Sequence, residues 1–375
     1  MLKLIETNPS DLRNSLVGEQ DDAQNLPIPR TGFTLIELMM VIAIIGILVG
    51  LIVPAVFYAM RSVKVKAIAI EVNGLAQDIE AYKNKYGDYP PDGTNRVVFE
   101  RHYRKLFPQI AATEFTILYA CVNPGDPTLA ANNTGVMDPP EALVFALGGF
   151  SKDAIHPFTG PGGPLISVPG SNPVTYQYNT DRTEPIYEFN VAQLTIDTSS
   201  GSTLSSEDGD AIPVYHPKGL TAPFVYFDSR TYSFPATASP STNVSYRNGT
   251  FFNYYGSVTV GFARPYKSSK VNTNVAATAA NAETYYEYMN NRKFQIVSAG
   301  LDDNYGGIPI GGTPAGPVLY MFPGGQSLDY SNWNSSTAPT AGTWTRYKDT
   351  DPPLNYQFDN ATNFAEGPLS DSLSN

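Results

Sequence analysis

Glu37 is the single charged residue in an apolar block that runs from Phe33 to Met40, and the continuation from Leu38 to Met60 contains no charge. As a helix, that continuation would extend roughly 34 Å at about 1.5 Å per residue, enough to cross the apolar core of a bilayer. An acid in such a segment is costly, and acids found there usually mark function. Glu37 lies near the end of the run, where the cost is smaller, but its carboxylate still needs a partner.

A second group of polar side chains lies near the C-terminus, in two strings. Asp302, Asp303 and Asn304 occupy the glycine-bounded segment 298–306, directly after a strand-like run, and the second string is Asp-Asn-Ala-Thr-Asn-Phe at 359–364. Carboxylate and amide oxygens are the ligands that a hard cation takes. The alternative is an ordinary solvated Asx turn.

Enzyme motifs are missing from the sequence. The three histidines, His102, His156 and His216, lack the spacing of a metal site, and there is no nucleophile elbow, phosphate-binding loop or dinucleotide-binding glycine string. The net charge of −11, with lysines and arginines scattered along the chain, argues against nucleic-acid binding, which needs a basic surface. We therefore predict that the protein is not an enzyme and binds no nucleic acid.

The string Arg-Thr-Gly-Phe-Thr-Leu-Ile-Glu-Leu at 30–38 resembles the prepilin cleavage and methylation motif of type IV pilins and type II secretion pseudopilins. The resemblance implies that a prepilin peptidase cuts after Gly32 and that Phe33 becomes the N-methylated terminus. Glu37, one helical turn later, would meet the terminal ammonium of a neighbouring subunit in a filament core. Pro54 also suits the family, whose helices loosen near such a position, because a proline inside a helix removes a backbone hydrogen bond.

A cleaved secretory signal and a plain membrane anchor are the simpler alternatives. A secretory signal has an apolar run of about 7–15 residues that ends at a cleavage site, which is shorter than the run found here. A plain anchor explains the length of the run but leaves Glu37 without a role.

The helical pattern continues beyond Arg61 as an amphipathic segment. Apolar residues recur at 4-3-4-3-4 spacing, which places them on one face of a helix: Ile68, Val72, Leu75, Ile79, Tyr82 and Tyr86. Gly87 and the Pro90-Pro91 pair predict its end. We therefore expect one helix over 33–86, whose second half needs a folded domain to cover one stripe.

Beyond this helix the signals are mixed and then strand-like. Asp138 and Glu141 form a capping box that predicts a short helix ending at Gly148, and 101–107 predicts another. Strand patterns separated by Ser/Thr/Gly/Asn-rich loops follow at 175–178, 186–189, 224–227, 257–260 and 294–297. Two loops, 198–212 and 232–250, look long and mobile.

The two acidic strings resemble the C-terminal calcium loop of the major pseudopilins. The resemblance implies that Asp302, Asp303, Asp359 and Asn363 converge on one calcium ion, with backbone carbonyls completing its shell. Cys121 is the only cysteine, so no intramolecular disulfide is available, and an ion is a reasonable alternative staple for long loops. The insertion between the strings is longer than the family leads us to expect.

The predicted fold class is α+β, with a long N-terminal helix packed on an antiparallel β domain. The expected divisions are a leader at 1–32, a transmembrane and filament-core helix at 33–60, its amphipathic half at 61–89 and a β-rich head at 90–375. We expect a single-pass inner-membrane protein with a periplasmic head before assembly.

The function that the resemblance implies is that of a major-type pseudopilin, a structural subunit of a type II secretion filament. Its partners would be other copies of itself, minor pseudopilins, a prepilin peptidase and the inner-membrane assembly platform. The alternative is a surface type IV pilin for adhesion, motility or DNA uptake, and a third possibility is a membrane-tethered domain that forms no filament.

Overall fold

The computed structural model describes most of the chain, and the structural statements below concern these residues only. The described ranges are 32–122, 136–171, 174–197, 204–205, 210–232, 246–248, 251–253, 262–276, 281–306, 318–329, 344–346 and 359–372. The chain divides into two compact units, Met1–Tyr58 and Ala59–Asn375. The fold is α+β, as the sequence predicts: one long helix, shorter helices and several small sheets with loops.

Helix α1 spans Leu35–Tyr86 and contains Pro54 in its interior. Its start is capped by side chains, since Thr34 and Glu37 exchange hydrogen bonds across the first turn. It ends as predicted, at Gly87 with a φ of +81°, a conformation that glycine adopts at little cost. All side chains in unit 1 from Phe33 onward are exposed, so no described residue covers this apolar part of the helix.

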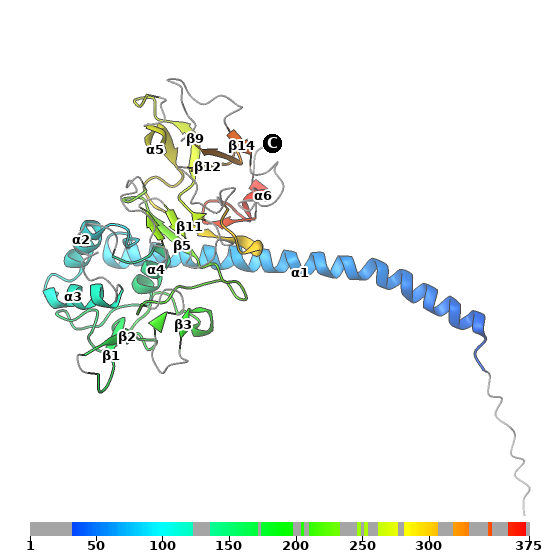
Figure 1. Ribbon diagram of the computed structural model, residues 1–375, viewed down its shortest axis with the longest axis horizontal. Helices are drawn as coiled ribbons and strands as arrows, with labels where there is room; N and C mark the ends of the chain where they lie inside the picture. The colour runs from blue at the N-terminus through cyan, green and yellow to red at the C-terminus, as the bar shows by residue number, and fades with distance from the viewer. Residues whose placement is uncertain are drawn as a thin grey trace, which may run out of the picture. The chain divides into compact units, whose positions relative to one another are not determined.

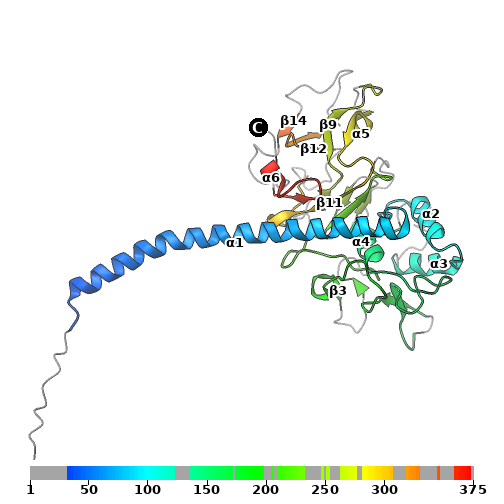
Figure 2. The same cartoon turned by 180° about the vertical axis from the view of Figure 1, so that it is seen from behind.

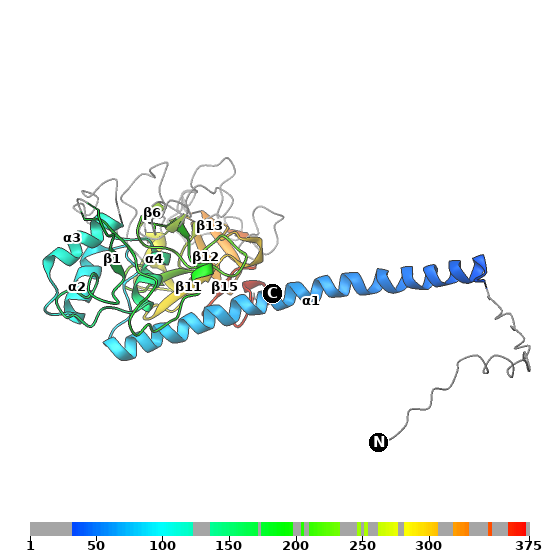
Figure 3. The same cartoon turned by 90° about the horizontal axis from the view of Figure 1, so that it is seen from below.

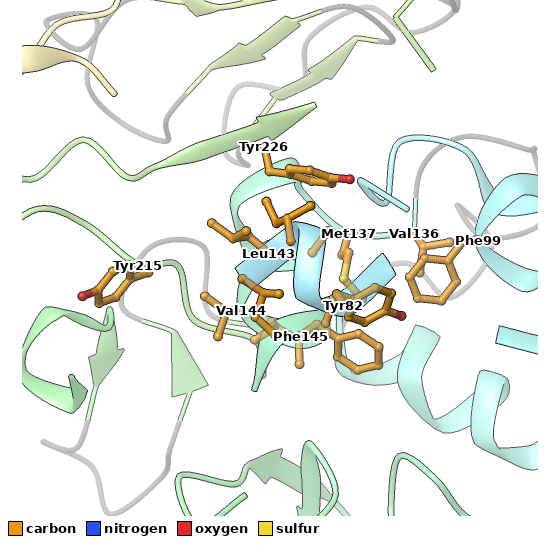
Figure 4. Packing of buried hydrophobic residues seen from close by; sticks show 14 of the residues in the cluster. Tyr82, Phe99, Val136, Met137, Leu143, Val144, Phe145, Tyr215 and Tyr226 are labelled. Carbon is orange, nitrogen blue, oxygen red and sulfur yellow. The ribbon is translucent and has the colours of Figure 1, made fainter. Parts of the chain in front are cut away.

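From Ile68 onward, α1 packs against the rest of the second unit, to which this part of the helix belongs. Its predicted apolar stripe is buried, with Val72, Leu75, Ile79 and Tyr82 completely shielded from solvent. The head covers one side of this part of the helix (Figure 3). At the C-terminal end of the stripe, Tyr82 packs among Met137, Phe145 and neighbouring apolar side chains (Figure 4).

Three short helices follow α1 and complete this core. They are α2 (Arg96–Leu106), α3 (Ala112–Cys121) and α4 (Pro139–Leu147). The capping box predicted for α4 is present, with Glu141 accepting a hydrogen bond from the Asp138 backbone N–H at 2.6 Å. Helix α2 begins five residues earlier than the predicted 101–107, because Asn95 caps it by accepting from the Val98 N–H at 3.0 Å.

A three-stranded antiparallel sheet lies at the centre of the head, in the order β15-β11-β5 (Figure 1). Its strands are β5 (Val225–Asp228), β11 (Phe294–Ser298) and β15 (Ala361–Thr362). Side chains alternate across it: Tyr226 and Ile296 join the core with α1, whereas Phe227 and Val297 face a second apolar cluster. The sheet therefore separates two cores and brings residues 361–362 beside 297–298.

The second apolar cluster includes side chains of a five-stranded sheet in the order β10-β9-β12-β13-β14. Strands β9, β12 and β14 of this sheet are labelled in Figure 2. The strands are β9 (Lys267–Val271), β10 (Tyr286–Tyr288), β12 (Val318–Phe322), β13 (Gln326–Asp329) and β14 (Trp344–Arg346), with α5 (Ala282–Tyr285) preceding β10. The β9–β12 pair is parallel and the other pairs are antiparallel. The prediction was an antiparallel β domain, so this sheet differs from it in one strand pair.

Smaller sheets and turns make up the rest of the described head. They are β1–β2 (Leu165–Ser167 and Tyr176–Tyr178), β3–β4 (Ile196–Asp197 and Leu204–Ser205) and β6-β7-β8 (Tyr246–Asn248, Phe251–Asn253 and Phe262–Ala263), together with the 3-10 turns Val191–Gln193 and Gly300–Asp302 and the short α6 (Leu369–Ser372).

Of the five strands predicted from the sequence, three are present, one is absent and one lies outside the described residues. Those at 175–178, 224–227 and 294–297 correspond to β2, β5 and β11. The strand expected at 186–189 is wrong: Ile186 and Tyr187 donate their N–H groups to the Leu147 carbonyl at the end of α4, so this segment follows a helix terminus rather than a strand. Residues 257–260, and most of the loops 198–212 and 232–250, lie outside the described residues.

Candidate functional site

The predicted cleavage site lies immediately before the capped start of α1. The Thr34 N–H and hydroxyl both donate to Oε2 of Glu37, each at 2.8 Å, and the Glu37 N–H donates to the Thr34 hydroxyl at 3.3 Å. Oε1 of Glu37 accepts no hydrogen bond from any described residue. The cap therefore fixes the carboxylate while leaving one oxygen for an outside donor.

The residues around this cap are open to their surroundings. Phe33 is 82% exposed, and a side chain added at Gly32 would meet no described atom within 4 Å. Helix α1 is long and apolar enough to cross a membrane. Pro54 lies inside the helix, which is unbroken at this position. Glu37 is thus an exposed acid at the start of a charge-free helical surface.

The two acidic strings meet, as predicted, although they are more than fifty residues apart. The Leu301 and Asp302 N–H groups donate to Oδ2 of Asp359 at 2.8 and 3.2 Å. Gly300 makes this approach possible: its φ is +72°, and a Cβ there would overlap the Asp359 carbonyl oxygen and lie 2.7 Å from its Cγ. The sheet supplies the register, because Ala361 of β15 pairs with Ser298 of β11.

The carboxylates of Asp302 and Asp359 form a close, electrostatically unfavourable pair. Burial raises the pKa of Asp302, and repulsion from Asp359 raises it further. Burial also raises the pKa of Asp359, against the hydrogen bonds that its carboxylate accepts. Such a pair is stabilised by a bound proton or by a cation.

The side chains of the other two predicted ligands, Asp303 and Asn363, form hydrogen bonds with backbone groups of neighbouring segments. Asp303 accepts from the Ala222 N–H at 2.7 Å and from the N–H and hydroxyl of Thr221, so its carboxylate fastens the segment before β5. Asn363 accepts from the Ile296 N–H at 3.0 Å and donates to the Phe294 carbonyl at 3.3 Å. Both side chains therefore hold backbone groups of neighbouring segments.

Two buried oxygen atoms beside the carboxylate pair accept no hydrogen bond from the described residues. Oδ1 of Asp359 is buried and accepts no hydrogen bond from the described residues, and the same holds for Oδ1 of the neighbouring Asn360. Among the described residues no group of three or more His, Cys, Asp or Glu side chains could hold a metal. Calcium takes carboxylate, carbonyl, amide and water oxygens, so the carboxylates of Asp302 and Asp359 and the amide oxygen of Asn360 are groups that would suit it, whereas a site for a metal that prefers nitrogen or sulfur ligands would not use them.

A partly buried polar network, which sequence patterns did not predict, joins the end of α1 to β5. Arg230 donates to Asp88 at 2.9 Å, to Asp228 at 2.5 Å and to the Tyr89 carbonyl at 2.7 Å. Asp92 is buried and accepts from the Asp228 N–H at 3.0 Å. Burial raises the pKa of Asp228 to about 7, although Arg230 acts against it. We call these residues (Asp88, Asp92, Asp228 and Arg230) the helix–head clamp.

The three histidines lie in unrelated places. His102 is buried in the α1 core, with Nε2 2.9 Å from the Tyr82 hydroxyl, and burial lowers its pKa to about 4. His156 contacts Asp153 at the surface, and the Nδ1 atom of His216 lies against the carbonyl of the adjacent Pro217.

A cavity of about 260 Å³ is lined by Tyr178, Arg182 and Phe189, among other residues. The Nε and Nη1 atoms of Arg182 are buried and do not contact solvent.

Comparison with known families gives one match, at the N-terminus. Residues 29–53 match the prokaryotic N-terminal methylation motif, and this range includes Gly32, Phe33 and Glu37. Comparison with curated proteins and with solved structures gives no match. The motif and the long apolar helix that begins within it are consistent with the type IV pilin-like superfamily and support a subunit that is processed as a prepilin.

Proposed function

We propose that this protein is a structural subunit of a pilus-like filament that assembles through α1. The observation that carries the proposal is Glu37: an exposed carboxylate with one unpartnered oxygen, held by Thr34 at the start of a charge-free helix inside the methylation motif. A surface of that kind is stable only when a membrane or other apolar helices cover it. Before assembly it is the membrane that does so, and in the filament it is other copies of α1.

Assembly then proceeds in three steps: cleavage, methylation and pairing with a neighbouring copy. A prepilin peptidase cuts after Gly32, and the Phe33 amine becomes a terminal ammonium that is methylated. The cap by Thr34 orients the Glu37 carboxylate, whose free Oε1 accepts the ammonium of a neighbouring copy. Because that pair lies among apolar helices, its attraction is far stronger than in water, and it fixes the register between subunits.

A major-type pseudopilin of a type II secretion system is the form of subunit that we favour. The convergence of Asp302 and Asp359 supports it, since these strings resemble the calcium loop of that class. Asp302 and Asp359 would hold the ion together with carbonyls of the 298–306 loop. When bound, calcium neutralises the carboxylate pair and fastens the C-terminal string to β11.

The alternative within the same superfamily is a surface pilin for adhesion, motility or DNA uptake. Many surface pilins carry a C-terminal disulfide loop, and Cys121 is the only cysteine here. Under either form the head would be periplasmic before assembly, and the partners would include the prepilin peptidase, minor subunits and an inner-membrane platform. Deletion of the gene should abolish secretion of folded proteins under the first form, and adhesion, motility or DNA uptake under the second.

Processing provides the direct test of the proposal. Mass spectrometry of membrane-extracted protein should find Phe33 as the terminus, carrying one methyl group, and Gly32→Ala should leave most chains uncut. Filaments sheared from cells should contain only the processed form. Finding Met1 intact in assembled filaments would refute the assignment.

A further inference from the structure

Three cations follow directly after the charge-free run of α1. Arg61, Lys64 and Lys66 are all exposed, and no acid occurs between Glu37 and Glu71. These six residues from Arg61 to Lys66 therefore carry three positive charges in a chain whose net charge is −11. Arg61 and Lys64 lie about 60° apart around the helix, and Lys66 lies about 140–160° from both. Because they surround the helix, we call these three residues the basic collar.

The basic collar forms no ion pair and no side-chain hydrogen bond with the described residues of the head. Arg61 does act on one acid of the head from a distance. Burial raises the pKa of Asp359, whereas hydrogen bonds to its carboxylate and the charge of Arg61 lower it. Within the part of the chain that the structure describes, the three cations are thus left for a partner outside the chain.

The length of the preceding helix places the basic collar at the surface of a bilayer. The charge-free run ends at Met60 after roughly 34 Å of helix, which is about the thickness of the hydrocarbon core. Tyr58 is 78% exposed one turn before the collar, and tyrosine is enriched where acyl chains meet headgroups. The collar rises over about 7.5 Å, and the headgroup layer on each side is about 5–7 Å thick. The three cations therefore lie at the depth of the lipid phosphates.

The charge of the basic collar fits an anionic headgroup. The chain as a whole is acidic and is repelled by an anionic surface, so the collar supplies a local attraction that the rest of the chain lacks. Each lysine or arginine close to such a surface strengthens binding by about fivefold. With the head periplasmic, as proposed above, these cations also lie on the side where membrane proteins carry few of them, which calls for a compensating partner there.

We propose that the basic collar binds the phosphate groups of anionic phospholipids, such as phosphatidylglycerol, on the head side of the membrane. The inference rests on the proposed membrane-spanning role of α1 and names the lipid class that holds the subunit before assembly. A zwitterionic lipid offers the same phosphate together with an ammonium group that the collar repels, and it therefore binds more weakly.

Competition between two lipids tests this proposal on the full-length chain in detergent micelles. With equal amounts of phosphatidylglycerol and phosphatidylcholine, native mass spectrometry should find the anionic lipid retained about fivefold or more over the other. Replacing all three collar residues by glutamine should bring this ratio close to one. Glutamine is about as good a helix former as lysine and arginine, so the melting temperature should not change. Lys66→Gln alone should lower the ratio in the same direction without disturbing Arg61 and Asp359.

The matched control replaces Arg101, Lys105 and Lys218 by glutamine. These are exposed cations that form no ion pair with a described residue, so the control has the same net charge as the collar variant. It should keep the lipid preference of the wild-type chain. Raising the ionic strength from about 0.1 M to about 1 M, which shortens the screening length from about 10 Å to about 3 Å, should remove that preference.

Equal retention of the two lipids by the wild-type chain, or an unchanged ratio in the collar variant, would overturn the inference. Inorganic phosphate at the same concentration should not displace phosphatidylglycerol; if it does, the collar binds soluble anions and the lipid assignment is wrong. The assignment is also wrong if the collar variant loses filament yield while its lipid preference is unchanged, since the collar then contacts protein. Lipid retention is measured on single subunits, so a wild-type chain that forms no filaments would refute the proposed function and leave this result standing.

Discussion

Replacing Asp302 by asparagine tests whether the carboxylate pair is a cation site, because it removes one of two charges that repel each other. The folded-state pKa values of Asp302 and Asp359 are raised above the unfolded value near 3.9. Between those values the native chain therefore holds more protons than the unfolded chain. Without a cation, the free energy of unfolding should fall as the pH rises from about 4 towards and beyond neutrality.

The size of this effect follows from the geometry of the pair. One proton changes the free energy of unfolding by at most about 1.4 kcal/mol per pH unit. Asp302 is more than a third exposed, so water screens part of the repulsion, and we expect a total contribution of about 1–2 kcal/mol between pH 5 and pH 8. A calcium ion that bound only the folded state would add about 2.7 kcal/mol at a hundredfold excess over its Kd.

Thermal melting of a truncated chain that begins at Arg61 gives the measurement. In chelator, the wild-type chain should melt lower at pH 8 than at pH 5, and calcium should restore the melting temperature at pH 8. Asp302→Asn should reduce both responses, whereas Asp371→Asn, at an exposed position on α6, should leave them unchanged. Equal melting temperatures with and without calcium, or an Asp302→Asn variant that still responds, would show that the pair is an ordinary turn.

Three further outcomes follow from the described contacts. Glu37→Leu should insert and fold normally but lower filament yield roughly tenfold or more, because the ammonium of a neighbour loses its partner; normal yield would give Glu37 another role. Arg230→Ala should lower the free energy of unfolding, measured by chemical denaturation, by about 3–5 kcal/mol at pH 8, because Asp228 stays buried without its cation. The loss should be smaller at pH 5, where the Asp228 carboxyl is protonated, and equal losses at both pH values would contradict this reason. Gly300→Ala should lower the free energy of unfolding by about 1–3 kcal/mol, because the φ of Gly300 is +72° and a Cβ there would overlap Asp359. A variant with unchanged stability and an intact calcium response would show that the contact between Gly300 and Asp359 does not require glycine.

The long helix and the motif that precedes it are encoded in local sequence patterns. The charge-free run, the 4-3-4-3-4 apolar stripe and the Gly87 stop are all local patterns, and α1 follows them because helical side-chain contacts are made within four residues along the chain. The capping box of α4 and the strands β5 and β11 were predictable for the same reason. The motif at 30–38 was readable because its specificity lies in adjacent residues, and the match over 29–53 agrees with it.

Which polar residues meet could not be predicted from local patterns, because it depends on contacts between distant segments. Asp302 and Asp359 come together because β15 pairs with β11, and Asp303 and Asn363 accept hydrogen bonds from the backbone N–H groups of Ala222 and Ile296. The helix–head clamp joins residues that are more than 130 positions apart, and no local pattern reports such a distance. The 186–189 segment illustrates the same point. Its alternating apolar residues predict a strand, but its Ile186 and Tyr187 N–H groups donate to the Leu147 carbonyl at the end of α4. Local periodicity fixes the shape of a segment, whereas the partners of its polar groups depend on which distant segments the core brings beside it.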